Sequence, residues 1–204
     1  MRSHISDPGS IPLKLRPPDG FLEPATCRIC EGWKPPRAHH SQLTNRCVFR
    51  MDHACKWIGN VVGYSNQKYF ILLLVYACTL AVSNCIILSG SLWGCYSLGS
   101  HFSRLEVVFL VINVTGFFIC RSYLSDQLEF IESNVTLIET FQNSQGRSDG
   151  VDVFRQVFGR NPWLWPLPIF SSAPPDYTEP VFAASSLSKK DADSLGVDLY
   201  EKLD

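Results

Sequence analysis

The sequence lacks a strong imbalance of charge, since 18 Lys and Arg stand against 19 Asp and Glu for a formal net charge of −1. A protein that binds nucleic acid usually carries a basic excess, so this balance predicts no nucleic-acid partner. Residues 1–23 lack the continuous apolar core of a secretory leader, because Pro and Gly interrupt polar sequence. Cysteine is too scarce, at 8 in 204 residues, to indicate a small disulfide-stapled secreted domain.

The cysteines that are present form two groups with different surroundings. One group lies in polar sequence that also contains histidine, and it consists of Cys27, Cys30, Cys47 and Cys55. The other lies in or beside apolar runs, and it consists of Cys78, Cys85, Cys95 and Cys120. Because a free thiol packs as a small apolar side chain, the second group is interpreted as small membrane-buried side chains. The first group is the one that suggests chemistry.

Two long apolar runs occupy the middle of the chain. Residues 69–90 contain no charged side chain, and residues 105–124 contain only Glu106 and Arg121, which can reach a membrane interface. A helix over the first run extends about 33 Å, enough to cross a hydrocarbon core of about 30 Å. We therefore expect a mainly α membrane protein with two transmembrane helices. A pair of buried helices in a soluble protein is the alternative.

Basic residues lie mostly on one side of these two runs. The segment before the first run carries Lys34, Arg37, Arg46, Arg50, Lys56 and Lys68. The connection, residues 91–104, carries only His101 and Arg104, whereas Arg147, Arg155 and Arg160 follow the second run. The positive-inside rule then predicts that both flanking parts face the cytosol and that the connection lies on the lumenal or external side. Cytosolic thiols stay reduced and free to bind metal or attack a substrate.

The first cysteines form a CCHC pattern, with Cys27 and Cys30 separated by two residues and His40 and Cys47 on a returning segment. Three thiolates and one imidazole suit a tetrahedral zinc ion. A redox CxxC is the competing interpretation, although the apolar strand-to-helix context of such a motif is missing. His39 is the alternative imidazole ligand, and the spacing alone does not choose between the two neighbours.

A separate unit follows at Asp52, His53 and Cys55. A carboxylate orients an imidazole and the imidazole removes a proton from a thiol in many cysteine nucleophiles. A second metal site or a chance grouping on the surface are the alternatives for so short a string.

Taken together, these units resemble the DHHC family of integral membrane protein S-acyltransferases. The resemblance covers residues 7–170, and the matching motifs are CRIC at 27–30, KPPRAHH at 34–40, CVFRMDHAC at 47–55, Trp57, Asn60, Gly63, Asn66 and KYF at 68–70. Two membrane spans follow these motifs in the family, as they are expected to do here.

The resemblance implies a zinc-stabilised, loop-rich cytosolic domain that usually holds two zinc ions. It assigns the first zinc to Cys27, Cys30, His40 and Cys47. The positions of the second site fall on Ser41, Thr44, Ala54 and Val61, none of which is a good zinc ligand. The chain is therefore expected to hold one zinc ion and resembles a fungal subgroup of the family that has lost the second site.

The resemblance also implies the chemistry. It makes Cys55 the nucleophile that accepts a palmitoyl group from palmitoyl-CoA and passes it to a cysteine of a substrate protein near the bilayer. His53 is then the base and Asp52 its orienting partner. Trp57 and Lys56 are candidate contacts for the acyl-CoA, although Lys56 is equally well interpreted as a solvated surface residue. An endomembrane (ER or Golgi) or the plasma membrane is the expected location.

Several positions depart from the family pattern. Its Thr-Thr-x-Glu motif reads Thr136-Leu137-Ile138-Glu139 here, with one hydroxyl absent. Val153 stands where the family usually has an Asn that holds the C-terminal segment. The stretch NPWLWP at 161–166 supplies aromatic side chains suited to a membrane interface.

The expected layout has seven parts: an N-terminal cytosolic segment 1–23, a DHHC-like catalytic domain 24–68, a span 69–90, a connection 91–104, a span 105–124, a cytosolic segment 125–170 and a flexible tail 171–204. The family normally has two further spans before its Asp-Pro-Gly element, which is Asp7-Pro8-Gly9 here. The chain is therefore expected to lack those spans. A catalytically impaired membrane scaffold or pseudoenzyme is the alternative function.

Overall fold

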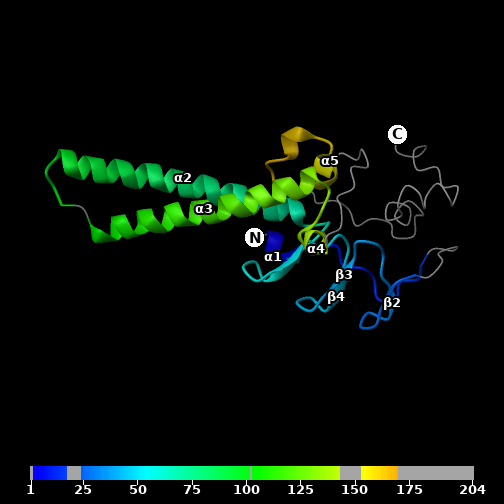
Figure 1. Cartoon of the computed structure of the whole chain (residues 1–204). Coiled ribbons are helices and arrows are strands. Elements are labelled where there is room, and N and C mark those ends of the chain that lie inside the picture. The colour runs from blue at the N-terminus through cyan, green and yellow to red at the C-terminus, as the bar shows by residue number, and fades with distance from the viewer. Residues whose placement is uncertain (1, 18–23, 102, 143–152, 170–204) are drawn as a thin grey trace.

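A computed structural model describes residues 2–17, 24–101, 103–142 and 153–169. Two long helices, α2 (Gln67–Ser97) and α3 (Arg104–Glu132), lie side by side and project from a small body of short strands and helices at one end (Figure 1). The predicted flexible tail, residues 171–204, lies outside the described residues. The molecule thus separates an apolar helix pair from a compact cysteine-rich body.

The body contains three two-stranded antiparallel hairpins, each turning through a residue in the left-handed region. Their strands are β1 (Thr26–Cys27) with β2 (Gly32–Trp33), β3 (His39–Ser41) with β4 (Arg46–Val48), and β5 (His53–Cys55) with β6 (Asn60–Val62). The turn residues Glu31, Asn45 and Gly59 have φ values of 52°, 50° and 61°. A positive φ lets the chain reverse tightly, so these hairpins present short strands whose side chains meet across them.

The helix pair runs past the predicted spans at its ends. α2 continues to Ser97, so the first half of the predicted connection is helical, and α3 begins at Arg104. No proline interrupts residues 91–97, and the chain leaves the helix just before Gly99, whose φ is 64°. A capping box between Ser103 and Glu106 then starts α3.

Both helices are long and apolar enough to cross a membrane. At about 1.5 Å per residue, the 31 residues of α2 extend about 46 Å and the 29 residues of α3 about 44 Å. Away from the cysteine-rich body, many of their apolar side chains face outward rather than into a protein core, and Ile86 and Ile87 are each 68% exposed. Between the helices, the Asn84 amide donates a 3.1 Å hydrogen bond to the Asn113 side-chain oxygen.

The remaining helices gather where the helix pair joins the body. They are α1 (Arg2–Ile5), α4 (Leu137–Phe141), α5 (Val153–Phe158) and a 3-10 turn η1 (Pro162–Leu164). Val153 is buried against Ile71 and Ile131 of the long helices, so the position where the family usually has Asn is held here by apolar packing. The buried Lys68 ammonium donates to the backbone carbonyls of residues 158, 164 and 169. The C-terminal segment is thereby attached to the first turn of α2. We call the ends of α2 and α3 that join the body the feet of the helix pair.

Candidate metal centre and active site

The first two hairpins bring together the four residues of the CCHC pattern. The ligand atoms of Cys27, Cys30, His40 and Cys47 all lie within 4.8 Å of one another. His40, rather than His39, faces the sulfurs: its Nδ1 lies 3.6, 3.4 and 3.9 Å from the sulfurs of Cys27, Cys30 and Cys47 respectively. Zinc bonds of about 2.3 Å to sulfur and 2.05 Å to nitrogen in a tetrahedron place these atoms about 3.6 Å apart. The donor set therefore fits a tetrahedral metal ion.

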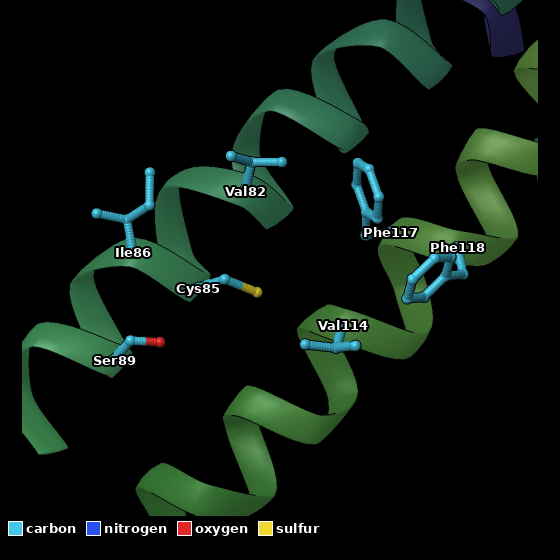
Figure 2. Close-up of a pocket in the computed structure, with 7 residues that line it drawn as sticks. All are labelled: Val82, Cys85, Ile86, Ser89, Val114, Phe117 and Phe118. Carbon is cyan, nitrogen blue, oxygen red and sulfur yellow. The ribbon is translucent and has the colours of Figure 1, made fainter.

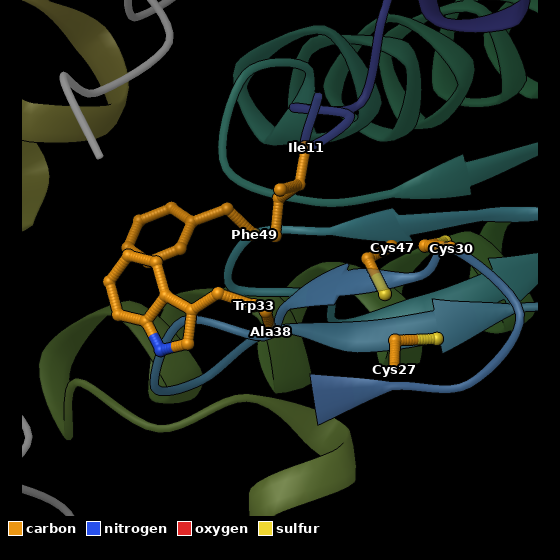
Figure 3. Packing of buried hydrophobic residues seen from close by; sticks show 7 residues of the cluster. All are labelled: Ile11, Cys27, Cys30, Trp33, Ala38, Cys47 and Phe49. Atoms are coloured by element: carbon orange, nitrogen blue, oxygen red, sulfur yellow. The ribbon is translucent and has the colours of Figure 1, made fainter. Parts of the chain in front are cut away.

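The surroundings of this centre are apolar. The three cysteines are buried in one cluster with Ile11, Trp33, Ala38 and Phe49. Figure 3 shows the cysteines on one side of that cluster and the rings of Trp33 and Phe49 on the other. Burial raises the pKa of the Cys47 thiol, and the neighbouring sulfurs of Cys27 and Cys30 raise it further. Negative charge on the Cys47 sulfur is therefore costly unless a cation shares it.

The positions of the family's second zinc site carry no ligand cluster. Within the residues that the structure describes, the CCHC set is the group of Cys, His, Asp and Glu side chains able to hold a metal ion. Ala54 and Val61 are cross-strand partners in the β5–β6 hairpin. Val61 is fully buried against Val48 and Met51, with Ile138 packed beside them. Apolar packing thus surrounds Val61, whereas Ala54 is exposed and Ser41 and Thr44 are polar.

The third hairpin carries the Asp52, His53 and Cys55 unit. The Asp52 carboxylate is almost fully buried, and its Oδ2 lies 2.8 Å from His53 Nδ1. Since an ionised carboxylate only accepts hydrogen bonds, Nδ1 carries the proton and Nε2 keeps its lone pair. The His53 ring meets the Phe70 ring edge to face at a centroid distance of 5.2 Å. This arrangement orients His53 as a base.

Cys55 lies where the hairpin meets the helix pair. It is buried in a cluster with Ile58, Val62, Phe70 and Leu74, against which Leu73, Cys120 and Leu124 also pack. The thiol therefore lies beside apolar side chains of α2 and α3, near the ends of these helices that join the body. Farther along the helices, an open apolar pocket of about 510 Å³ lies between them. Figure 2 shows Cys85 and Ser89 of α2 pointing toward α3, with Val114 and Phe117 across from them.

Three donors from three parts of the fold converge on Asp52. Besides His53, the Leu137 backbone N–H donates to Oδ1 at 2.8 Å and the Gln127 side-chain amide donates to Oδ2 at 2.8 Å. Burial by itself raises the pKa of Asp52, but the hydrogen bonds from His53, Leu137 and Gln127 outweigh it and hold this pKa below its usual value. The carboxylate is therefore ionised at neutral pH despite its burial.

The Thr136–Glu139 motif holds the helix that contacts Asp52. Thr136 and Glu139 form a capping box at the start of α4, which aims the Leu137 N–H at the carboxylate. Arg37 then binds Glu139 through two hydrogen bonds, Nε to Oε1 at 2.6 Å and Nη2 to Oε2 at 2.8 Å. Burial raises the pKa of Glu139, but Arg37 lowers it below its usual value. Leu137 has no side-chain hydroxyl, and its backbone N–H is the group that donates a hydrogen bond to Asp52.

The candidate acyl-CoA contacts lie on the surface of the β5–β6 turn. Trp57 is 91% exposed, and Lys56 is also exposed. Both follow directly after Cys55 and are accessible to a ligand that approaches it. Their role stays a prediction.

Some residues of the site were not predicted from the sequence. Gln127, Gln67 and the Leu137 N–H support Asp52 although they lie outside every cysteine or histidine motif. The one available signal is a glutamine near the end of each long helix, where charged residues such as Lys68 and Asp126 also lie, and a polar residue near a helix end is too common to indicate a site. Their contribution depends on contacts between distant parts of the chain.

Comparisons with known proteins agree with this geometry. The family model DHHC palmitoyltransferase matches residues 21–144. The chain is 32% identical over 167 residues to Palmitoyltransferase ZDHHC15 of Xenopus laevis, covering 76% of this chain and 49% of that protein. It is 35% identical over 176 residues to Palmitoyltransferase ZDHHC15A of Danio rerio, covering 79% and 52%. It is 30% identical over 193 residues to Probable protein S-acyltransferase 12 of Arabidopsis thaliana, covering 82% and 66%.

In the first two of these matches the chain spans about half the length of the relative. The family model nevertheless covers more than half of the chain, including both the metal centre and the Asp52, His53 and Cys55 unit. The chain therefore belongs to the DHHC palmitoyltransferase family.

Proposed function

We propose that this protein is an S-acyltransferase that moves a palmitoyl group from palmitoyl-CoA to cysteines of substrate proteins through an acyl-Cys55 intermediate. The observation that carries the proposal is the 2.8 Å hydrogen bond from His53 to the buried Asp52 carboxylate. His53 lies two residues before Cys55, whose thiol packs against the helix pair. The palmitoyltransferase names of the relatives favour this function over the scaffold alternative.

The first step acylates the enzyme. His53 Nε2 takes the proton of the Cys55 thiol, and the thiolate attacks the thioester carbonyl of palmitoyl-CoA. The bond between the carbonyl carbon and the CoA sulfur breaks, and the CoA thiolate leaves and takes up the proton from His53. Asp52 holds the ring and stabilises the imidazolium that forms between these events.

The second step regenerates the enzyme. A substrate thiol gives its proton to His53 Nε2 and attacks the carbonyl of acyl-Cys55. The substrate keeps the palmitoyl group, and Cys55 leaves as a thiolate and is reprotonated by His53. Atoms and charge balance in both steps without an oxidant, a reductant or a nucleotide.

The position of Cys55 suits a donor with a hydrocarbon tail. Phe70 and Leu74 of α2 pack with the thiol in one cluster, and Val82 farther along α2 lines the apolar pocket between the helices. An acyl chain that lies along these side chains buries apolar surface, at about 0.8 kcal/mol for each CH₂. The exposed Trp57 and Lys56 remain for the polar CoA end, with Lys56 offering charge to a phosphate.

The two long helices are proposed to cross the membrane with the cysteine-rich body on the cytosolic side. Their exposed apolar side chains, such as Ile86, suit a lipid surrounding, and the connection between α2 and α3 then faces the lumen or the exterior. Trp163, which is 87% exposed on η1 at the foot of the pair, is placed for the interface. Substrate cysteines near the membrane of an endomembrane compartment or the cell surface are then within reach of Cys55.

Cys27, Cys30, His40 and Cys47 are proposed to hold one zinc ion. The metal would supply cross-links that stiffen the first two hairpins, with no part in the transfer itself. The second site is replaced by the apolar packing of Val61.

The test is acyl labelling of the full chain with a palmitoyl-CoA analogue in detergent micelles. Wild-type protein should carry a hydroxylamine-sensitive label, Cys55→Ser should carry none, and His53→Ala should lose most of it. Cys120→Ser is the matched control, because Cys120 packs against the same cluster as Cys55 without belonging to the hairpin. Labelling that persists in Cys55→Ser would refute the assignment.

A further inference from the structure

Two buried glutamines connect the feet of the long helices to the candidate active site. The Gln67 side-chain nitrogen, in the first turn of α2, lies 3.3 Å from the Gln127 side-chain oxygen of α3. The Gln127 nitrogen lies 2.8 Å from Asp52 Oδ2. Gln67 is 4% exposed and Gln127 is 3% exposed. Burying a polar side chain this deeply costs free energy unless it makes hydrogen bonds, and buried amides are therefore normally hydrogen-bonded.

The chemistry of the contacts sets the direction of both amides. An ionised carboxylate offers acceptors only, so Gln127 must present its NH₂ group to Asp52. Its carbonyl oxygen then faces Gln67, which donates to it and opposes a flip of the amide. Gln67 therefore keeps Gln127 in the one orientation that is a donor to Asp52.

The oxygen that receives the Gln127 amide is the same one that receives His53. Oδ2 accepts from both side chains, whereas Oδ1 accepts from the Leu137 N–H. A carboxylate held by donors on both oxygens cannot rotate away from the imidazole without losing a hydrogen bond. The direction of the Asp52–His53 contact thus depends on Gln127.

We propose that Gln127 is a positioning residue that, oriented by Gln67, holds the Asp52 carboxylate on His53 Nδ1 and so leaves Nε2 as the ring nitrogen available to the Cys55 thiol. This inference rests on the proposed acyl transfer only for the identity of the reaction. It makes activation of Cys55 sensitive to how α2 and α3 meet at their feet.

The test compares Gln127→Leu and Gln127→Glu in the full chain. The readout is the rate at which iodoacetamide alkylates Cys55, followed by mass spectrometry of its peptide, together with the rate of acyl labelling at saturating donor. Gln127→Leu removes the amide, and we expect both rates to fall roughly tenfold because one hydrogen bond to a charged group is lost. The half-saturating concentration of palmitoyl-CoA should stay unchanged. Gln67→Leu should have a smaller effect of about threefold, since Gln127 keeps its bond to Asp52.

The two substitutions at position 127 should differ in their pH dependence. Gln127→Glu places a second carboxylate against Asp52, and such a pair takes up a shared proton as the pH falls. Once protonated, the introduced carboxyl group is again a donor to Asp52. The Gln127→Glu rate relative to wild type should therefore rise with acidification, and the Gln127→Leu ratio should not. The titratable or charged groups that act on Asp52 are His53 and Arg50, whereas α2 and α3 contribute neutral amides and α4 a backbone N–H.

Gln42→Leu and Gln42→Glu are matched controls, because Gln42 is an exposed residue of the β3–β4 turn. They should leave both rates at the wild-type value. Unchanged Cys55 alkylation in Gln127→Leu, or equal pH trends in the two Gln127 variants, would overturn the positioning role. Absence of acyl labelling in the wild type, with alkylation still dependent on Gln127, would instead refute the transferase and leave the positioning role standing.

Discussion

The ion pair between Arg37 and Glu139 allows a quantitative test of how the C-terminal segment supports the active site. Two hydrogen bonds of 2.6 and 2.8 Å join the guanidinium to both carboxylate oxygens. The Arg37 and Glu139 side chains are only 23% and 13% exposed. Glu139→Gln keeps the shape of the side chain but removes its charge, so it leaves a partly buried guanidinium without its counterion.

The expected cost lies between two limits. Removing one partner of a buried ion pair costs about 3–5 kcal/mol, whereas exposed pairs contribute about 0–1 kcal/mol. Arg37 keeps hydrogen bonds of 3.1 and 3.0 Å to Asn134, and water reaches part of its side chain. We therefore expect Glu139→Gln to lower the free energy of unfolding by about 2–3 kcal/mol. In the double variant, adding Arg37→Met to Glu139→Gln should lower the free energy of unfolding by less than Arg37→Met does in the wild type, because it removes the unpaired charge.

The same change should slow the reaction. Glu139 Oε2 accepts a 2.9 Å hydrogen bond from the Thr136 N–H and so closes the capping box of α4. Weakening that cap loosens the Leu137 N–H that donates to Asp52. We expect acylation of Cys55 to slow severalfold in Glu139→Gln.

The assay is denaturant unfolding of the full chain in detergent micelles, followed by circular dichroism and paired with acyl labelling. Glu31→Gln is the matched control, because its ion pair with Lys14 is 69–75% exposed. It should change the free energy of unfolding by less than about 0.5 kcal/mol. Equal losses in Glu31→Gln and Glu139→Gln, or strict additivity in the double variant, would refute the reasoning.

Three further predictions concern the metal, acid pH and membrane orientation. Elemental analysis should find one zinc per chain, falling to near zero in Cys47→Ser, and two zinc ions would contradict the apolar replacement of the second site. Asp52 and Glu139 have lowered pKa values, so their stabilisation is complete above the usual values of 3.8 and 4.5 and is lost as the pH falls below them. Acid titration of the unfolding free energy should show this loss, and a rise in stability over that range would be inconsistent with it. Protease treatment of sealed microsomes should cleave the cysteine-rich body and spare residues 98–103, and the opposite pattern would reverse the proposed orientation.

The sequence by itself determined the features that depend on local pattern. The uncharged run at 69–90 predicts a helix long enough to cross a membrane, and the structure contains such a helix. The CCHC spacing predicts four ligands in one place, and their side chains do gather within 4.8 Å. Both signals lie in composition and short spacing, which a chain carries before it folds.

Where the first helix ends was less predictable. Residues 91–97 read SLWGCYS and are predicted to belong to the connection, because the continuous apolar run ends at Gly90, yet they continue α2. Helix formation adds a hydrogen bond for each further residue, and nothing before Gly99 interrupts it. The boundary was set by that cooperativity.

Only the tertiary structure decided how Asp52 is held. Its donors at Gln127 and Leu137 are 75 and 85 residues away in sequence, and Gln67 is 60 residues from Gln127. No local pattern encodes such contacts, because each depends on how the two long helices and α4 pack against the third hairpin. The local order Asp-His-x-Cys specifies which groups react, whereas long-range packing sets their orientation.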